Sequence, residues 1–237
     1  MQKIWSLDNG SIFPPTSEAL DEPNGLLAMG GELSSQRLLA AYRRGIFPWY
    51  SEPQPVLWWT PDPRSVLFPE ELHISRSLQK TLRADALHLA IDTRFTQVID
   101  ACAELRDDGL GTWIDDDMTD AYSLLHSQGY AHSIEVLDAD GGLLGGLYGL
   151  ALGKVFFGES MFSRRSNCSK VALVALVHLL RQHDFRMIDC QVESEHMNSL
   201  GARNISRLDF EQRLAQTVDV EIDPNIWCLP STCGELL

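Results

Sequence analysis

The chain has 237 residues, of which 44% are hydrophobic and 22% are charged, and its formal net charge is −14. These values are typical of a globular protein with one large domain, or one domain with a small appendage. A membrane-spanning protein is not expected, because no stretch of the sequence approaches the ~20 apolar residues of a membrane-spanning helix. No secretory signal is visible, and the five cysteines are scattered without a CxxC pair. We therefore expect a cytoplasmic protein without a disulfide framework or a zinc site.

The negative charge is unevenly distributed along the chain. Residues 34–83 and 154–186 carry net charges of +3 and +4, whereas residues 84–153 between them carry −11. Two basic islands in an acidic protein are compatible with a local phosphate-binding surface. Ordinary charge scatter explains the same pattern at least as well, so the composition allows an RNA contact without requiring one.

The first predicted element is a helix in "SSQRLLAAYRRG", residues 34–45, which a serine can cap and the glycine can end. The proline-rich segment that follows, "IFPWYSEPQPVLWWTPDPR", cannot be helical and predicts short extended pieces. We expect a boundary near Pro61, which divides the chain into a small N-terminal domain, 1–62, and a larger domain, 63–237.

Strands and helices alternate at the start of the larger domain. The expected elements are strands at 64–68 and 87–92 and helices at 75–83, about 95–107 and 117–128. The segment "HSIEVLDADGGLLGGLYGLALGKVFFGE" predicts three antiparallel strands with a hairpin turn at Asp140-Gly141. An apolar helix, "SKVALVALVHLLRQH", and a short strand, "RMIDCQV", complete the pattern.

Antiparallel strands followed by a helix and another strand are the core order of the acyltransferase fold that includes the GNAT acetyltransferases. In those enzymes a glycine-containing loop at the strand-to-helix turn holds the pyrophosphate of coenzyme A with its backbone amides. Here the corresponding turn, "SRRSNCSK", contains no glycine. An enzyme that uses coenzyme A is therefore disfavoured.

The stretch "FFGESMFSRRSN" places Glu159 just before a pair of arginines. Two interpretations stay open from these residues alone. Glu159 is either a catalytic acid or a buried charge that Arg164 or Arg165 neutralises.

Several motifs then occur in one order along the chain. They are "EPNGLLAMGGELS", "RGIFPW", "LWWTPDPR", "HISRSLQKTLR", "GTWI", "AYSLLHSQGYAHSIEVLD", "GGLYG", "FFGESMFSR", "SK" and "IDCQV". Together they resemble the leucyl/phenylalanyl-tRNA–protein transferase family, from about residue 22 to 215. The resemblance implies an α+β fold, in which a small N-terminal domain joins a GNAT-like domain with a mostly antiparallel sheet flanked by helices.

The resemblance also implies the activity. Members move Leu or Phe, and Met less well, from aminoacyl-tRNA to proteins that begin with Arg or Lys, which marks them for degradation by the N-end rule. The ester is already activated, and the attacking α-amino group has a reference pKa of about 7.7–8.0, so no strong base is needed. We expect positioning and electrostatic stabilisation to dominate, without cofactor, metal, coenzyme A or membrane. His132 and His196 are interpreted as structural.

The reaction centre is expected at Asp189, Gln191 and Glu159. Asp189 and Gln191 are two residues apart, so on a strand both side chains point to one face, and the resemblance assigns them to the site. Gln191 could accept a hydrogen bond from the amine, while Asp189 orients Gln191 or holds the developing ammonium. The resemblance places Glu159 beside the aminoacyl end, where a carboxylate also suits an incoming Arg or Lys side chain.

The resemblance places two further sets of residues at the site. The aminoacyl pocket is expected to contain Trp49, Trp113, Leu147, Phe156, Met161, Leu173, Leu176 and Ile188. Met161 suits a pocket for two side-chain shapes because its thioether adapts, and Leu147 stands where the family often has Met. Tyr42 and Tyr122 could hold the terminal adenosine by stacking or hydrogen bonds. Ser194 stands where an Asn is common.

Residue spacing, rather than the resemblance, points to one more set on the helix at 75–83. Arg76, Lys80 and Arg83 form one stripe, while Leu78 and Leu82 lie on another face. We expect the stripe to contact the tRNA acceptor-stem backbone. The alternative is a solvated helix face, and for the whole chain the alternatives are a small-molecule acyltransferase using coenzyme A and a non-enzymatic RNA-binding module.

Overall fold

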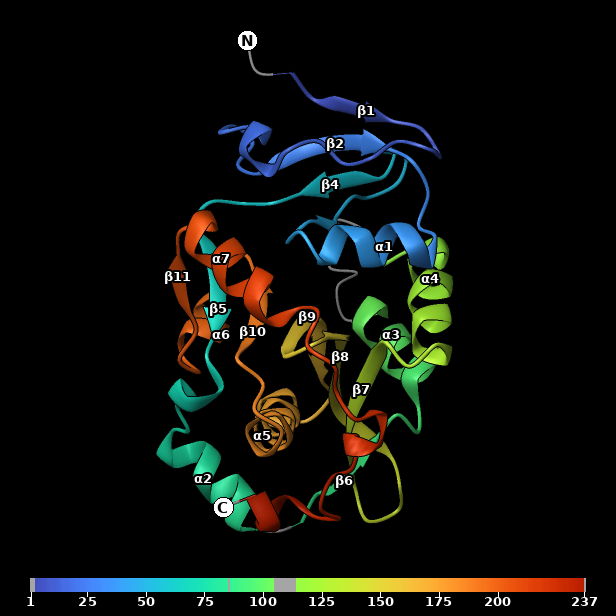
Figure 1. Ribbon diagram of the computed structural model, residues 1–237. Helices are drawn as coiled ribbons and strands as arrows, with labels where there is room; N and C mark the ends of the chain where they lie inside the picture. The colour runs from blue at the N-terminus through green and yellow to red at the C-terminus, as the bar shows by residue number, and fades with distance from the viewer. Residues whose placement is uncertain (1–2, 85, 105–113, 237) are drawn as a thin grey trace.

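The computed structural model describes residues 3–84, 86–104 and 114–236, and its strands form two sheets (Figure 1). The smaller sheet has the order β1-β2-β4-β3, with strands β1 (Trp5–Leu7), β2 (Leu26–Gly30), β4 (Leu57–Trp59) and β3 (Phe47–Pro48). The larger sheet has the order β11-β5-β10-β9-β8-β7-β6, with strands β11 (Arg203–Ile205), β5 (Arg64–Leu67), β10 (Met187–Gln191), β9 (Val155–Ser163), β8 (Leu143–Leu152), β7 (Ala131–Leu137) and β6 (His88–Ile91).

The helices pack mainly against the larger sheet. They are α1 (Ser35–Tyr42), α2 (Arg76–Arg83), α3 (Phe95–Glu104), α4 (Asp116–Ser127), α5 (Cys168–Gln182), α6 (Glu195–Asn198) and α7 (Arg207–Thr217), with 3-10 turns η1 (Thr16–Glu18), η2 (Pro69–Glu71), η3 (Pro224–Ile226) and η4 (Cys233–Leu236). Ser34 caps α1 by accepting a hydrogen bond from the Arg37 amide, as expected of one of the two serines there.

Within the described residues, the neighbouring strands of the larger sheet are antiparallel except for β9 and β10, which are parallel. Helix α5 connects these two strands. The predicted α+β fold, with its mostly antiparallel sheet flanked by helices, is confirmed. Because a parallel pair needs a crossover, the end of β10 comes to lie beside the middle of β9, and this juxtaposition positions the site.

Helices cover both faces of the larger sheet. Helix α5 contacts β7, β8 and β9 on one face, where α2 and η4 also pack, while α3 and α4 cover the other face. In α5 the apolar residues surround the helix axis, which is expected of a helix that is buried on all sides. Both faces of β8 are likewise buried over most of its length.

Gly149 on β8 is required by its close packing against β9. A Cβ at this position would lie 2.1 Å from the carbonyl oxygen of Phe157 and 2.6 Å from the Phe156 ring. The last glycine of "GGLYG" therefore allows the Phe156 ring to lie against β8.

Most expected element boundaries are confirmed to within about one or two residues. The helix expected over 95–107 ends at Glu104, and residues 105–107 lie outside the described residues. The pairing of β1 with β2 was not anticipated. Leu78 and Leu82 are buried, whereas the stripe on α2 is exposed, as expected.

The chain passes from the smaller to the larger sheet between Trp59 and Arg64. One hydrophobic cluster nevertheless includes Tyr42 and Trp58 on one side of this point and Phe157 on the other. We keep the division at residue 62 as a proposal, in which the two parts share a core.

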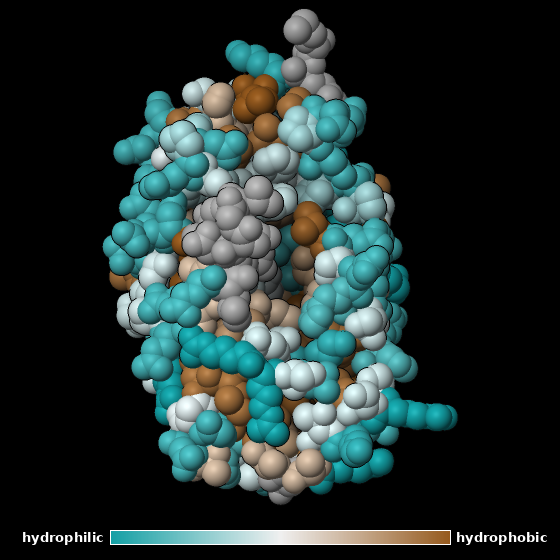
Figure 2. All heavy atoms as spheres, turned by 180° about the vertical axis from the view of Figure 1, so that it is seen from behind, coloured by the Kyte–Doolittle hydropathy of each residue, from teal (hydrophilic) through white to brown (hydrophobic). Residues whose placement is uncertain are grey.

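None of the helices in the described part of the chain combines the length and the apolar character that a bilayer crossing requires. From behind, the surface is mainly hydrophilic, with apolar side chains gathered around a hollow in its middle (Figure 2).

Candidate active site

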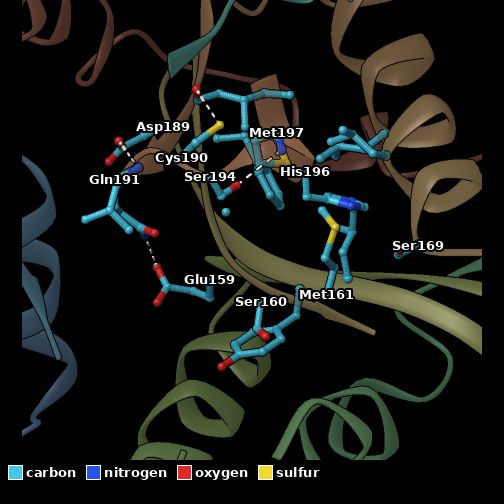
Figure 3. Close-up of a pocket in the computed structure, with 18 of the residues that line it drawn as sticks. Glu159, Ser160, Met161, Ser169, Asp189, Cys190, Gln191, Ser194, His196 and Met197 are labelled. Carbon is cyan, nitrogen blue, oxygen red and sulfur yellow. Dashed lines mark hydrogen bonds between the residues drawn. The ribbon is translucent and has the colours of Figure 1, made fainter. Parts of the chain in front are cut away.

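A cavity of about 480 Å³ lies where the end of β10 meets β8 and β9 (Figure 3). Helices α5 and α6 and the segment around β3 complete its walls. Such a volume is within the range of small-molecule sites, which are mostly apolar with a few polar groups that fix orientation. The cavity follows this pattern: a broad apolar wall ends at a polar corner formed by Glu159 and Gln191.

The apolar wall contains all of the expected aminoacyl-pocket residues that the structure describes. They are Trp49, Leu147, Phe156, Met161, Leu173, Leu176 and Ile188. Trp113 lies outside the described residues. These side chains come from β8, β9, β10, α5 and the segment around β3, so only the folded chain brings them together. Their contact with an aminoacyl group remains a prediction.

Glu159 is the centre of the polar corner. Its Oε1 accepts hydrogen bonds from the Tyr42 hydroxyl at 2.7 Å and the Gln191 Nε2 at 3.2 Å, and its Oε2 accepts one from the Tyr122 hydroxyl at 3.0 Å. Arg164 is directed elsewhere, with Nη2 3.1 Å from the Glu104 Oε2. Tyrosines and an amide therefore partner Glu159, and Arg164 does not.

The surroundings of Glu159 favour a proton on it. Burial raises its pKa to about 7, against the opposing effect of the two tyrosine hydrogen bonds. The hydroxyls of Tyr42 and Tyr122 also contact each other, so two hydroxyl hydrogens serve three oxygen–oxygen contacts. When Glu159 is protonated, its own hydrogen serves the third contact, and one of the tyrosines accepts from Glu159 instead of donating to it. Burial, with Glu159 nearby, raises the pKa of both tyrosines well above the usual value.

Asp189 is enclosed by an ion pair beneath the cavity. Arg64 donates from Nε to Oδ1 at 2.8 Å and from Nη2 to Oδ2 at 2.7 Å, and both residues are fully buried. Asp189 Oδ1 also accepts a hydrogen bond from the Gln191 backbone amide at 3.0 Å. Both carboxylate oxygens of Asp189 are thus engaged within the protein.

Gln191 does not continue β10 as a regular strand. Its φ is +58°, and the pairing of β10 with β5 shifts register between Asp189 and Gln191. The expectation that both side chains share one face assumed a regular strand, and that assumption was wrong. The irregularity turns the Gln191 side chain toward Glu159 (Figure 3).

The first turn of α5 lies at the end of the segment "SRRSNCSK", and two of its backbone amides form hydrogen bonds within the chain. The Cys168 amide donates to the Arg165 carbonyl at 3.1 Å, and the Ser169 amide donates to the Ser163 Oγ at 2.7 Å. Asn167, in place of a glycine, has a φ of +70°. These two amides of the first turn are therefore already hydrogen-bonded within the chain, and independence from coenzyme A remains a prediction.

Comparisons with known proteins agree with these motifs. Residues 66–215 match the model of leucyl/phenylalanyl-tRNA protein transferase, and residues 31–62 match the model of its N-terminal domain. A leucyl/phenylalanyl-tRNA–protein transferase of Pseudomonas entomophila (strain L48) is 57% identical, over 91% of this chain and 95% of the relative. One of Nitrosospira multiformis is 55% identical, over 94% of this chain and 95% of the relative.

The chain belongs to the leucyl/phenylalanyl-tRNA–protein transferase family. Solved structures that it resembles include a GNAT-family acetyltransferase of Staphylococcus aureus Mu50, with 14% identity and a TM-score of 0.34 over 42% of this chain and 70% of that one. Another is an aminoglycoside acetyltransferase from an uncultured soil metagenomic sample, with 14% identity and a TM-score of 0.38 over 58% of this chain and 92% of that one.

The positions of Tyr42 and Tyr122 bear on the expectation that these rings stack on the terminal adenosine of tRNA. Both rings are fully buried, and their hydroxyls bind Glu159. Neither ring has a face open to a base in this structure, so the arrangement does not provide the expected stacking. Contact with the terminal adenosine remains a prediction.

The two histidines interpreted as structural differ in their surroundings. His132 is buried and stacks on Trp227, and its Nδ1 donates to the Asp92 Oδ2 at 2.7 Å. His196 lies in the cavity wall on α6, and partial burial together with Lys170 lowers its pKa.

Arg64 and Phe47 lie at the site, although the sequence predicted no role for either of them. Both stand in motifs of the family resemblance, at the end of "LWWTPDPR" and inside "RGIFPW". A buried arginine needs a carboxylate partner. This requirement was the available signal that Arg64 pairs with an acidic residue of the site. In the described part of the chain, no group of three or more His, Cys, Asp or Glu residues could hold a metal ion.

Proposed function

We propose that this chain transfers Leu or Phe, and Met less well, from aminoacyl-tRNA to the α-amino group of proteins that begin with Arg or Lys. The observation that carries the proposal is a cavity whose apolar wall ends at Glu159 and Gln191. The wall suits side chains that differ in shape but not in polarity. The polar corner suits the ester carbonyl and the attacking amine. Together with family membership, this cavity supports an aminoacyl transfer that yields an N-degron.

The reaction needs one proton to move between two atoms of the substrates. The amine nitrogen forms a bond to the aminoacyl carbonyl carbon, and the ester bond to the ribose oxygen of tRNA breaks. The amine loses a proton, and the ribose oxygen gains one. A carboxyl group whose pKa is about 7 can take up and return that proton near neutral pH.

Hydrogen-bonding capacity constrains the role of Glu159. A carboxylate has about four acceptor positions, and Tyr42, Tyr122 and Gln191 fill three of them. One position remains, which suits one N–H of the attacking amine better than the two-pronged guanidinium of an incoming Arg. We therefore assign Glu159 to the amine, and Asp189 to support of Gln191.

The test is transfer of labelled leucine from charged tRNA to a peptide that begins with Arg, compared with the same peptide beginning with Ala. Labelled product with the Arg peptide alone supports the proposal. Acyl transfer from acyl-coenzyme A would instead support the small-molecule acyltransferase, and tRNA binding without transfer would support an RNA-binding module. The cytoplasmic setting is also proposed, because aminoacyl-tRNA is made there.

Shortening Met161 should weaken transfer without unfolding the protein. Met161 is partly buried in the cavity wall. Met161→Ala therefore removes contacts with the aminoacyl side chain and should raise the KM for aminoacyl-tRNA by ~10-fold to ~100-fold. Met187→Ala on the same sheet is the matched control, because Met187 is fully buried and does not line the cavity. That control should lower the free energy of unfolding by about 2–5 kcal/mol and leave the KM for aminoacyl-tRNA unchanged. If Met161→Ala unfolds instead, Met161 is a core residue.

The exposed stripe of Arg76, Lys80 and Arg83 on α2 is proposed to contact acceptor-stem phosphates. Reversing the three charges should raise the KM for aminoacyl-tRNA and flatten its dependence on salt, because fewer counterions are released. Aminoacyl-adenosine, which lacks the stem, should serve the variant as well as the wild type. Normal binding of full-length tRNA at low salt would show that the stripe is only a solvated face.

A further inference from the structure

Arg64 is the first residue of β5 and lies far from solvent. Its guanidinium lies between two aromatic rings, 4.9 Å from the centroid of Phe47 and 4.6 Å from that of Phe210. Phe47 belongs to β3 of the smaller sheet, and Phe210 belongs to α7. A guanidinium held between two ring faces has little freedom to reorient, so its direction is set by three separate elements.

This fixed guanidinium holds both oxygens of Asp189 in a two-pronged pair, with distances of 2.8 and 2.7 Å. Neither side chain of the pair is more than 1% exposed. Asp189 borders the cavity, but the pairing of both its oxygens favours a supporting role over direct contact with substrate. Its Oδ1 also accepts a hydrogen bond from the Gln191 amide at 3.0 Å.

That hydrogen bond coincides with the strained point of β10. Gln191 has a left-handed backbone with φ of +58°, which costs a non-glycine residue roughly 1–2 kcal/mol. Asp189 stabilises this turn through the Gln191 amide, and the turn allows the Gln191 Nε2 to reach the Glu159 Oε1 at 3.2 Å. A continuous set of contacts therefore runs from Arg64 through Asp189 and Gln191 to Glu159.

We infer that Arg64 is a positioning residue of the transfer reaction, because it fixes Asp189 so that Asp189 holds Gln191 against Glu159. The inference rests on the proposed function and assigns Asp189 a supporting role without substrate contact. Among the described residues, the titratable and charged groups that act most strongly on Glu159 are Tyr42 from α1, Tyr122 from α4, Asp189 from β10 and Arg64 from β5.

The test compares Arg64→Met, Asp189→Asn and the double variant. The control is Arg203→Met on the neighbouring strand β11, since Arg203 also forms a two-pronged pair, with Glu71, and lies 4.6 Å from the Phe68 centroid, but is half exposed and outside the cavity. Each single variant at the site should lower kcat by ~10-fold to ~100-fold with a smaller change in KM. Arg203→Met should change neither constant by more than about 2-fold.

The pH dependence distinguishes positioning from simple stabilisation. Asp189→Asn leaves a positive charge near Glu159, so the midpoint of the pH–rate profile should move to lower pH. Arg64→Met leaves a negative charge there, so the midpoint should move to higher pH. In the double variant the midpoint should return toward that of the wild type. Its kcat should exceed that of Arg64→Met, because the double variant leaves no unpaired buried charge and its side-chain amide oxygen can still accept from the Gln191 backbone amide.

Carbon-13 NMR of the Glu159 carboxyl, assigned by its loss in Glu159→Gln, follows the same titration without catalysis. If the variants show these opposite shifts although the wild type transfers nothing, the proposed function is contradicted while the contact network is preserved. A folded Arg64→Met with normal kcat would overturn the inference. So would losses of kcat that only follow the loss of folded protein while both midpoints stay in place.

Discussion

Asp189→Ala is expected to lower kcat by ~10²–10³-fold while the KM for aminoacyl-tRNA changes far less. The substitution removes the acceptor for the Gln191 amide and the partner of Arg64. Gln191 then loses the support for its left-handed backbone and for its contact with Glu159. The measurement is steady-state transfer at saturating and subsaturating aminoacyl-tRNA, corrected for the folded fraction.

The correction matters because Asp189→Ala leaves a buried arginine without a partner. Such a loss typically costs about 3–5 kcal/mol of stability, which urea denaturation will detect. Asp209→Ala is the matched control, since Asp209 pairs with Arg213 on the exposed side of α7. It should affect neither kcat nor stability by a large amount. Near-normal kcat in Asp189→Ala would remove Asp189 from the mechanism.

Glu159→Gln is expected to abolish the pH dependence that the carboxyl group contributes and to lower kcat by ~10²–10³-fold. Glu159 has a pKa of about 7, so wild-type activity should rise as pH increases through 7 and the carboxylate becomes able to take up a proton. The variant should retain only the rise due to the amine of the acceptor, near its reference pKa of about 7.7–8.0. Rate profiles from about pH 5.5 to about 9 separate the two contributions.

The same substitution has an opposite effect on stability. Burial raises the pKa of Glu159 from 4.5 to about 7, so the protonated form is favoured in the folded state. Wild-type stability should therefore fall as pH rises from about 4.5 to 7, by about 3 kcal/mol in total. A glutamine keeps a hydrogen for the tyrosine contacts at any pH, so Glu159→Gln should lose this fall and be more stable than the wild type at about pH 8.

Glu135→Gln is the control for both measurements. Glu135 is a buried carboxyl group on β7, bound by Ser133 and Thr93, and burial raises its pKa as well. It does not line the cavity. Its substitution should alter the dependence of stability on pH but not the rate profile. If Glu159→Gln retains the wild-type rate profile, Glu159 does not carry the proton.

Local signals in the sequence were sufficient to predict most of the helices and strands and the family. Helix caps, apolar periodicity and glycine turns depend on nearby residues, so α1, α2, α5 and the β7–β8 hairpin could be predicted from them. The apolar pocket residues could be named because the family motifs include them. The small parallel pair β1–β2 escaped prediction, because a strand of three residues carries no periodic signal.

The polar chemistry of the site, in contrast, depends on tertiary contacts. Glu159 meets Tyr42 and Tyr122 across 117 and 37 residues of chain, and Arg64 meets Asp189 across 125. Glu159, which precedes two arginines in the sequence, is thereby bound by tyrosines. The arginine at the site, Arg64, comes from β5 and binds Asp189 instead. The pKa of Glu159 and the left-handed turn at Gln191 depend on burial and on these distant partners. Such quantities arise from the packed three-dimensional arrangement, which no local pattern of residues encodes.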